Sequence, residues 1–361
     1  MTMTKPTTSP QDPPPKPTVA RWYIDTRRLT ATTTSLPLLE TLQPTERDAV
    51  QKFYHLKDKH MSLASNLLKY LYIHRAGRIP WAQIHLSRTP APHKRPCFIP
   101  SPQLLESHPE PIPPIEFNVS HQNSLVVLAG TTTSPTSTPT PTPPPSSSSL
   151  LSHSPNPTLP TSTSPSPPTP ILTTPQLGID ITCTNERHGT RGPEPRTRTS
   201  FESYISIFTE VFSATELHEI SSLTHPTRKW ALTSAAGVEY SYRVFFTYWA
   251  LKEAYIKMTG EALLAPWLRE LEFSDVVAPD VGEGPYRGTR VWLRGTEVEG
   301  VRVEVVAFEG DYLVATAARG GGVGEQAVDG EGDVWEELVR VDLESDVRPC
   351  TAGTCRCLVS G

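Results

Sequence analysis

Hydrophobic and polar residues follow strand-like and helix-like patterns in two successive rounds along the chain. In the first round, a short apolar run at residues 21–24 predicts an opening strand. Apolar residues at helical spacing between residues 44 and 73 predict a long helical stretch, and its threonine and acidic residues at the start are typical of a helix N-terminus. An apolar run at residues 124–129 predicts a further strand.

A second round of elements follows in a similar order. It begins with a strand-like run at residues 177–182 and continues with helical stretches near residues 201–222 and 243–259. Further strands are predicted near residue 271 and at residues 289–293, 301–306 and 312–316. The repetition predicts an α+β fold made of two similar halves.

Proline, serine and threonine dominate residues 131–170, between the two rounds. This segment has almost no apolar residues to bury, so it cannot offset the entropy that ordering would cost. We therefore predict a disordered insertion in a loop. Its proline pairs, such as Pro141 and Pro144, resemble SH3 or WW ligands, but the composition alone accounts for such matches.

These patterns divide the chain into five parts. We predict a disordered N-terminus, an N-terminal subdomain, the disordered insertion, a C-terminal subdomain and a flexible C-terminal tail, at residues 1–20, 21–130, 131–170, 171–319 and 320–361. Within the tail, residues 334–339 are compatible with a short appended helix or strand.

Charge and composition narrow the class of protein. The 361 residues carry a net charge of −5 with a pI near 6.1, so there is no overall basic field and no nucleic-acid partner is expected. No apolar run approaches the ~20 residues that a membrane span needs, and residues 1–17 lack the apolar core of a secretory signal. We expect a soluble cytoplasmic protein.

Five cysteines are too few and too scattered for a disulfide framework in a chain of this length, so reduced thiols are expected. Cys350, Cys355 and Cys357 cluster near the C-terminus, which suggests a metal site. Neither a histidine nor a second cysteine pair accompanies them at the usual spacing, so the sequence argues against structural zinc.

One helical segment carries the strongest chemical signal. Between residues 249 and 260, good helix formers place Trp249, Glu253 and Lys257 on one face, because residues four apart share a side of a helix. Taken alone, a glutamate and a lysine at this spacing are more often an exposed ion pair. Two upstream segments change that interpretation.

These segments, Asn118-Val119-Ser120-His121 and Gly178-Ile179-Asp180, each adjoin a run of strand-forming residues. In order and in type, the three blocks resemble the hallmarks of the Sfp-type 4′-phosphopantetheinyl transferases. The resemblance runs from about residue 22 to about residue 319. Softer matches, among them Ile79-Pro80-Trp81 and residues 208–213, favour the eukaryotic and particularly the fungal members.

The resemblance implies two pseudo-symmetric α+β subdomains with the ligand in the cleft between them. It also implies transfer of the 4′-phosphopantetheine arm of coenzyme A to a serine of an apo acyl or peptidyl carrier domain, with release of adenosine 3′,5′-bisphosphate. Carrier domains of aminoadipate reductase or of polyketide, fatty-acid or peptide synthetases would be the partners. The chain would act as a monomeric holo-acyl-carrier-protein synthase in lysine biosynthesis and secondary metabolism.

The resemblance also implies a magnesium site, since cleaving a pyrophosphate requires charge neutralisation and hard oxygen ligands suit Mg²⁺. Asp180 and Glu253 would be its two protein ligands. Many bacterial members carry a second acid two residues after the aspartate, where this chain has Thr182. Glu253 would also accept the proton of the carrier serine, and Lys257 would hold the pyrophosphate and the departing nucleotide.

Coenzyme A binding is implied for a further set of residues. Lys252 would reach a phosphate from the side of its helix, and Arg95 would replace a lysine that the family usually has. Because side chains alternate along a strand, Ser120 and His121 can share one pocket only if the strand has ended, so we predict a turn there. The full set of binding residues is Lys57, Arg88, Arg95, Asn118, Ser120, His121 and Lys252.

Two other functions fit parts of the sequence. One is a non-catalytic module that binds coenzyme A or carrier domains. In that case the absence of an acid at Thr182 would mean that the catalytic activity has been lost. An adaptor would depend on the proline-rich insertion. The joint presence of Asp180, Glu253 and Lys257 favours the enzyme over both.

Overall fold

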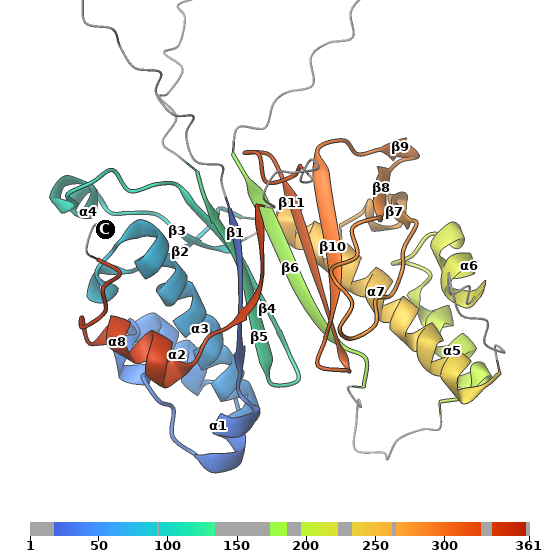
Figure 1. Cartoon of the computed structure of the whole chain (residues 1–361), viewed down its shortest axis with the longest axis horizontal. Coiled ribbons are helices and arrows are strands. Elements are labelled where there is room, and N and C mark those ends of the chain that lie inside the picture. Colours follow the sequence, from blue (N-terminus) through green and yellow to red (C-terminus); the bar gives the residue numbers. More distant parts are fainter. Residues whose placement is uncertain are drawn as a thin grey trace, which may run out of the picture.

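Two sheets pack face to face in the middle of the molecule, and each is covered on its outer face by one long helix (Figure 1). The computed structural model describes residues 18–91, 94–133, 174–185, 196–222, 233–261, 265–325 and 334–358. The predicted N-terminal disorder before residue 18 and the predicted insertion from residue 134 lie outside these residues. Among the described residues, no helix is both long and apolar enough to cross a bilayer.

The N-terminal half combines a three-strand unit with the long helix α3. Its strands lie in the order β1-β5-β4, and α3 packs its apolar residues against them. Its elements are β1 (Val19–Asp25), α1 (Arg27–Thr32), η1 (Leu39–Thr41), α2 (Pro44–Gln51), α3 (Leu56–Gly77), η2 (Trp81–Gln83), β2 (Leu86–Arg88), β3 (Pro96–Phe98), α4 (Pro102–Ser107), β4 (Ile115–Gln122) and β5 (Leu125–Thr132).

The C-terminal half repeats this plan, with strands in the order β6-β11-β10 and the long helix α7 on their outer face. The predicted α+β fold of two similar halves is therefore confirmed. Its elements are β6 (Gln176–Cys183), α5 (Arg198–Ile205), η3 (Ser206–Phe208), α6 (Ala214–Ser222), α7 (Ala235–Thr259), η4 (Leu268–Glu270), β7 (Leu271–Ser274), β8 (Arg290–Leu293), β9 (Thr296–Glu297), β10 (Val301–Phe308) and β11 (Tyr312–Arg319).

Side chains join the two sheets where the edge strands β4 and β6 lie together. The Asn118 amide oxygen accepts a hydrogen bond from the Ile179 backbone N–H at 3.0 Å, and the Gln122 amide oxygen accepts one from the Cys183 N–H at 2.7 Å. Backbone donors on an edge strand would otherwise lack a partner. We define this contact between β4 and β6 as the seam.

A buried charge cluster joins the sheets on the side away from the seam. Glu304 of β10 is 1% exposed and accepts a hydrogen bond from Arg21 of β1 at 2.8 Å. It also pairs with Arg302 and, at 2.7 Å, with Arg287. Burying a carboxylate is tolerable here because several guanidinium donors surround it.

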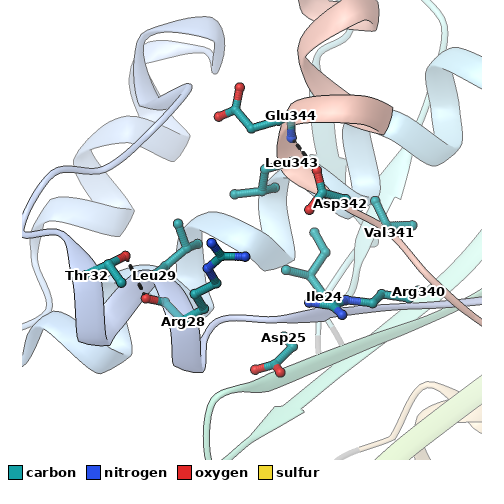
Figure 2. Close-up of a pocket in the computed structure, with 10 residues that line it drawn as sticks. All are labelled: Ile24, Asp25, Arg28, Leu29, Thr32, Arg340, Val341, Asp342, Leu343 and Glu344. Atoms are coloured by element: carbon teal, nitrogen blue, oxygen red, sulfur yellow. Dashed lines mark hydrogen bonds between the residues drawn. The ribbon is translucent and has the colours of Figure 1, made fainter.

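The C-terminal tail packs onto the N-terminal half, so the prediction of a flexible tail is wrong for residues 334–358. Its elements are β12 (Trp335–Arg340), the π-helical turn η5 (Leu343–Val347) and α8 (Arg348–Thr351). Strand β12 pairs in parallel with β1, and Trp335 is 4% exposed. Figure 2 shows Leu343 facing Ile24 and Leu29 around a pocket of about 340 Å³. Burial of these apolar residues offsets the cost of ordering the tail.

Helix α7 approaches β6 closely at Gly178. A methyl group at this position would collide with the carbonyl oxygen of Ala254 and the amide nitrogen of Met258, both in the backbone of α7. A backbone atom cannot move aside as a flexible side chain can. Glycine is therefore required here for the distance between α7 and β6.

We expect Gly178→Ala to lower the free energy of unfolding by about 1–3 kcal/mol, the usual cost of overpacking a close contact. Chemical denaturation monitored by circular dichroism measures this change. Gly284→Ala is the matched control, because a methyl group there meets no atom within 4 Å. Equal stability of the two variants would contradict the proposed constraint.

Candidate active site

Three elements bring one polar side chain each to a common point at the seam. Asp180 of β6 is 5% exposed and accepts hydrogen bonds from Ser120 of β4 at 2.8 Å and from Lys257 of α7 at 2.6 Å. The Lys257 ammonium also donates to the Ser120 hydroxyl at 2.9 Å. The three sequence blocks that carry the family resemblance therefore meet in space.

Glu253 lies one helical turn before Lys257 on α7 and is half-buried. Burial raises the pKa of its carboxyl group, and the negative charge of Asp180 raises it further, while Lys257 opposes the shift. The two carboxylates therefore repel each other electrostatically. A carboxylate with a raised pKa is better suited to accept a proton.

Two carboxylates in one place form a set of hard oxygen donors that suits Mg²⁺. A divalent cation would relieve the repulsion between Asp180 and Glu253, which the Lys257 ammonium now partly neutralises. The neighbouring Thr182 offers no third carboxylate, and its hydroxyl donates to Asp180 Oδ2 at 3.1 Å. The residues present therefore fit a magnesium ion held by two protein carboxylates and by other oxygen ligands.

A pocket of about 520 Å³ opens on the N-terminal half between α2, α3, β2 and β4. Its basic residues are Lys69 of α3, Arg88 of β2 and His121 of β4. A smaller cavity of about 150 Å³ shares Lys69 and His121 with it and is lined by Asn118 as well. The pKa of His121 is lowered by partial desolvation among these neighbours and by the positive charges of Lys257 and Lys69, although the side chain stays exposed to solvent. We refer to these two cavities as the basic pocket.

Lys69 is the site residue that the sequence reasoning missed. It is 8% exposed, and no hydrogen bond or ion pair joins its ammonium to another of the described residues. Burial lowers its pKa to about 8, with Glu46 opposing the shift and Arg88 adding to it. The available signal was a single lysine between Leu68 and Tyr70, inside an apolar stretch of the helix.

Strand β4 does not end at Ser120, so the prediction of a turn there is wrong. The strand continues to Gln122, and its ladder with β5 is unbroken through that residue. Ser120 points to Asp180, while His121, on the opposite face, lines the basic pocket. The strand thus serves two parts of the site through its alternating side chains.

Three other predicted binding residues have protein partners in this structure. Lys57 donates to the Asn123 side chain at 2.6 Å, at the tip of the β4–β5 hairpin. Arg95 pairs with Glu116 and donates to the carbonyl of Lys257 at 3.0 Å, so it links the N-terminal half to the end of α7. The Asn118 side chain holds the seam.

The prediction that Lys252 binds a phosphate is wrong for this structure. Lys252 is 1% exposed, forms an ion pair with the buried Glu216 at 2.8 Å and donates to the carbonyl of Leu268 at 3.0 Å. Its ammonium points into the core of the C-terminal half, away from the face of α7 that carries Lys257. Its role is to satisfy buried polar groups.

Comparison with known proteins agrees with this geometry. Residues 31–133 match the family "4'-phosphopantetheinyl transferase, N-terminal", and residues 176–317 match the "4'-phosphopantetheinyl transferase superfamily". The "4'-phosphopantetheinyl transferase A" of Aspergillus fumigatus is 53% identical, over 94% of this chain and 96% of the relative. The "4'-phosphopantetheinyl transferase NpgA" of Emericella nidulans is 50% identical, over 95% of this chain and 96% of the relative.

A more distant relative comes from Rattus norvegicus. Its "L-aminoadipate-semialdehyde dehydrogenase-phosphopantetheinyl transferase" is 25% identical over 78% of this chain and 68% of the relative. The family matches cover both halves of the fold and all three blocks that meet at the seam. The chain therefore belongs to the 4′-phosphopantetheinyl transferase superfamily, as a fungal Sfp-type member.

Proposed function

We propose that this protein transfers the 4′-phosphopantetheine arm of coenzyme A to a serine of apo carrier domains. The observation that carries the proposal is the convergence of Asp180, Glu253 and Lys257 beside the basic pocket. Two carboxylates and one ammonium suit a pyrophosphate that must be neutralised and cleaved, and the basic side chains nearby suit the remaining phosphate of coenzyme A.

The basic pocket is proposed to hold the nucleotide end of coenzyme A. Arg88 and Lys69 would bind its phosphate oxygens, and His121 lies between this pocket and the seam, where the pyrophosphate would follow. Lys57, at the tip of the β4–β5 hairpin, is proposed to approach the 3′-phosphate from outside the pocket. Phe53, an exposed aromatic residue at the pocket, offers an apolar surface to the adenine ring.

Asp180 and Glu253 would hold the magnesium ion. When bound, that ion would supply positive charge next to the pyrophosphate. Lys257 contributes charge from the same side, and Ser120 fixes the Asp180 carboxylate through its 2.8 Å hydrogen bond. The position of the two carboxylates depends in turn on the contact between α7 and β6 at Gly178.

The nucleophile is the serine hydroxyl of the carrier domain. Glu253 accepts the hydroxyl proton, and the serine oxygen forms a bond to the phosphorus that carries the pantetheine arm. The bond from that phosphorus to the bridging oxygen breaks, and adenosine 3′,5′-bisphosphate leaves with the electron pair. Lys257 stabilises the negative charge on the leaving phosphate and can donate a proton to it.

The carrier domains are proposed by analogy with the relatives. The name of the rat protein refers to aminoadipate-semialdehyde dehydrogenase, which points to aminoadipate reductase as one partner. Polyketide, fatty-acid and peptide synthetases are further candidates, and one enzyme serving several of them acts more broadly than a dedicated holo-acyl-carrier-protein synthase. We further propose that the protein acts as a monomer, because both halves of the site come from one chain, and that it works in the cytoplasm.

Incubation with coenzyme A, magnesium and an apo carrier domain tests the proposed function. We expect the carrier to gain the mass of one phosphopantetheine arm, and we expect chelation of the metal to stop the gain. Intact-protein mass spectrometry measures both. A protein that binds coenzyme A but modifies none of a panel of aminoadipate reductase, polyketide, fatty-acid and peptide carriers would be a binding module instead.

The two carboxylates are expected to be essential. Asp180→Ala and Glu253→Gln should each lower kcat by ~10²-fold or more, because each removes negative charge that holds the metal against the pyrophosphate. Glu253→Gln should be the more damaging, since it also removes the base. Glu239→Gln, at an exposed position of the same helix, is the control. A folded Asp180 or Glu253 variant with the turnover of that control would refute the assignment of its residue.

Lys69 is expected to bind coenzyme A only while it is protonated. Its pKa of about 8 means that the ammonium is charged below this pH and neutral above it. The kcat/KM for coenzyme A should therefore fall in wild type as the pH rises through about 8. Lys69→Met should raise the KM for coenzyme A by about tenfold and should lack this fall. A variant with an unchanged pH profile would show that another group titrates.

A further inference from the structure

Three cysteines of the tail and one histidine of α3 form a cluster where the tail packs against the N-terminal half. His74 contributes a ring nitrogen, and Cys350, Cys355 and Cys357 contribute their sulfur atoms, all within 4.8 Å of one another. None of the four lines the basic pocket or contacts Asp180. We propose that this cluster binds one structural zinc ion.

The four ligand atoms are close enough to surround one ion. Zinc–sulfur bonds of about 2.3 Å and zinc–nitrogen bonds of about 2.0 Å at tetrahedral angles place neighbouring ligand atoms about 3.5–3.8 Å apart. The sulfur atoms of Cys350 and Cys357 are 3.8 Å apart and match this spacing. The His74 Nε2 lies 3.1 Å from the Cys355 sulfur, at the distance of a thiol hydrogen bond, so these two atoms would separate slightly when an ion replaced the thiol proton. All the cysteines are free, and a sulfur separation of 3.8 Å far exceeds the ~2.05 Å of a disulfide.

The histidine is held in the form that a metal requires. Its Nδ1 lies 2.7 Å from the carbonyl oxygen of Ile79, and a carbonyl can only accept. In the neutral ring Nδ1 therefore carries the proton, and the Nε2 lone pair points at the thiols. The indole of Trp81 packs on the ring with centroids 6.1 Å apart. A hydrogen bond from the second ring nitrogen to a carbonyl is a usual support for a histidine ligand.

The chemistry of the ligands selects zinc and a structural role. Three thiolates and one imidazole are soft or borderline donors, which suit zinc and do not suit magnesium or calcium. Four protein ligands fill a tetrahedral shell and leave no position for a substrate. The sequence argued against zinc because its histidine lies 281 residues before Cys355, so no local spacing motif links them.

Such an ion would attach the end of the chain to α3. Three ligands lie within the eight residues from Cys350 to Cys357: Cys350 is in α8, and Cys355 and Cys357 follow that helix. The fourth ligand is in the last turn of α3. Nearby, the Arg75 guanidinium donates to the Asp346 carbonyl at 3.3 Å, a contact that is weak and partly exposed. The zinc would add a strong link to the apolar contacts of Val347 and Cys350 that already hold the tail here.

Metal content and stability of the full chain test the proposal. The untagged protein is purified under reducing conditions without chelators and analysed by inductively coupled plasma mass spectrometry. We expect about one zinc ion per chain in wild type and in Cys97→Ser, whose cysteine lies on β3 away from the cluster. Cys355→Ser and His74→Gln should lose most of this zinc, and their tails should be cleaved faster in limited proteolysis.

A second measurement uses wild type alone and does not depend on the folding of a variant. Chelation should lower the thermal midpoint and expose the tail to protease, and zinc should restore both. Cobalt added to the chelated protein should give the absorption bands of tetrahedral thiolate coordination. Protein that contains no zinc after growth in zinc-supplemented medium and gains no stability from added zinc would overturn the proposal. A disulfide among the three cysteines in protein purified without reductant and alkylated at once would also overturn it.

Discussion

The close contact between β6 and α7 at Gly178 is the constraint on which the active site depends. It sets the distance between Asp180 on the strand and the Glu253–Lys257 face of the helix. Because the seam with β4 adds Ser120 to the same point, the site exists only when both halves of the fold are in register. The positions of Asp180, Ser120 and Lys257 relative to one another are therefore set by contacts between elements. Two features hold this register. Apolar side chains fill the layer between the two sheets, and the charge cluster around Glu304 joins the sheets on the side away from the seam.

Periodicity and motif spacing predicted the two-half α+β fold and the shared face of Glu253 and Lys257, because both depend on local geometry. What they could not predict depends on partners remote in sequence. Lys252 is adjacent to Glu253 in the sequence, but its ion pair with Glu216, a residue of another helix, holds it in the core. Lys69 looked like one polar residue in a buried helix, and only the fold shows that it faces a pocket.

The structure of the C-terminal tail also depends on partners remote in sequence. Its glycine-rich start and its scattered polar residues are typical of a flexible segment. The apolar residues Trp335, Leu343 and Val347 are spaced too irregularly to give a periodic signal, yet all three are buried. Leu343 and Val347 belong to the core of the N-terminal half, and Trp335 belongs to the apolar layer between the sheets. Burial there is decided by the shape of a surface formed by residues near the beginning of the chain. Composition cannot report such complementarity.

The pairing of the first strand with the last has a consequence for synthesis on the ribosome. Arg21 of β1 donates a hydrogen bond to the Glu336 carbonyl, across 315 positions of the chain. Until β12 has left the exit tunnel, one edge of the N-terminal sheet has no partner, although its other elements were made long before. An open strand edge can pair with other chains, so this edge of β1 is exposed to such pairing until β12 is made. The sheet is therefore completed only after β12 has been synthesised.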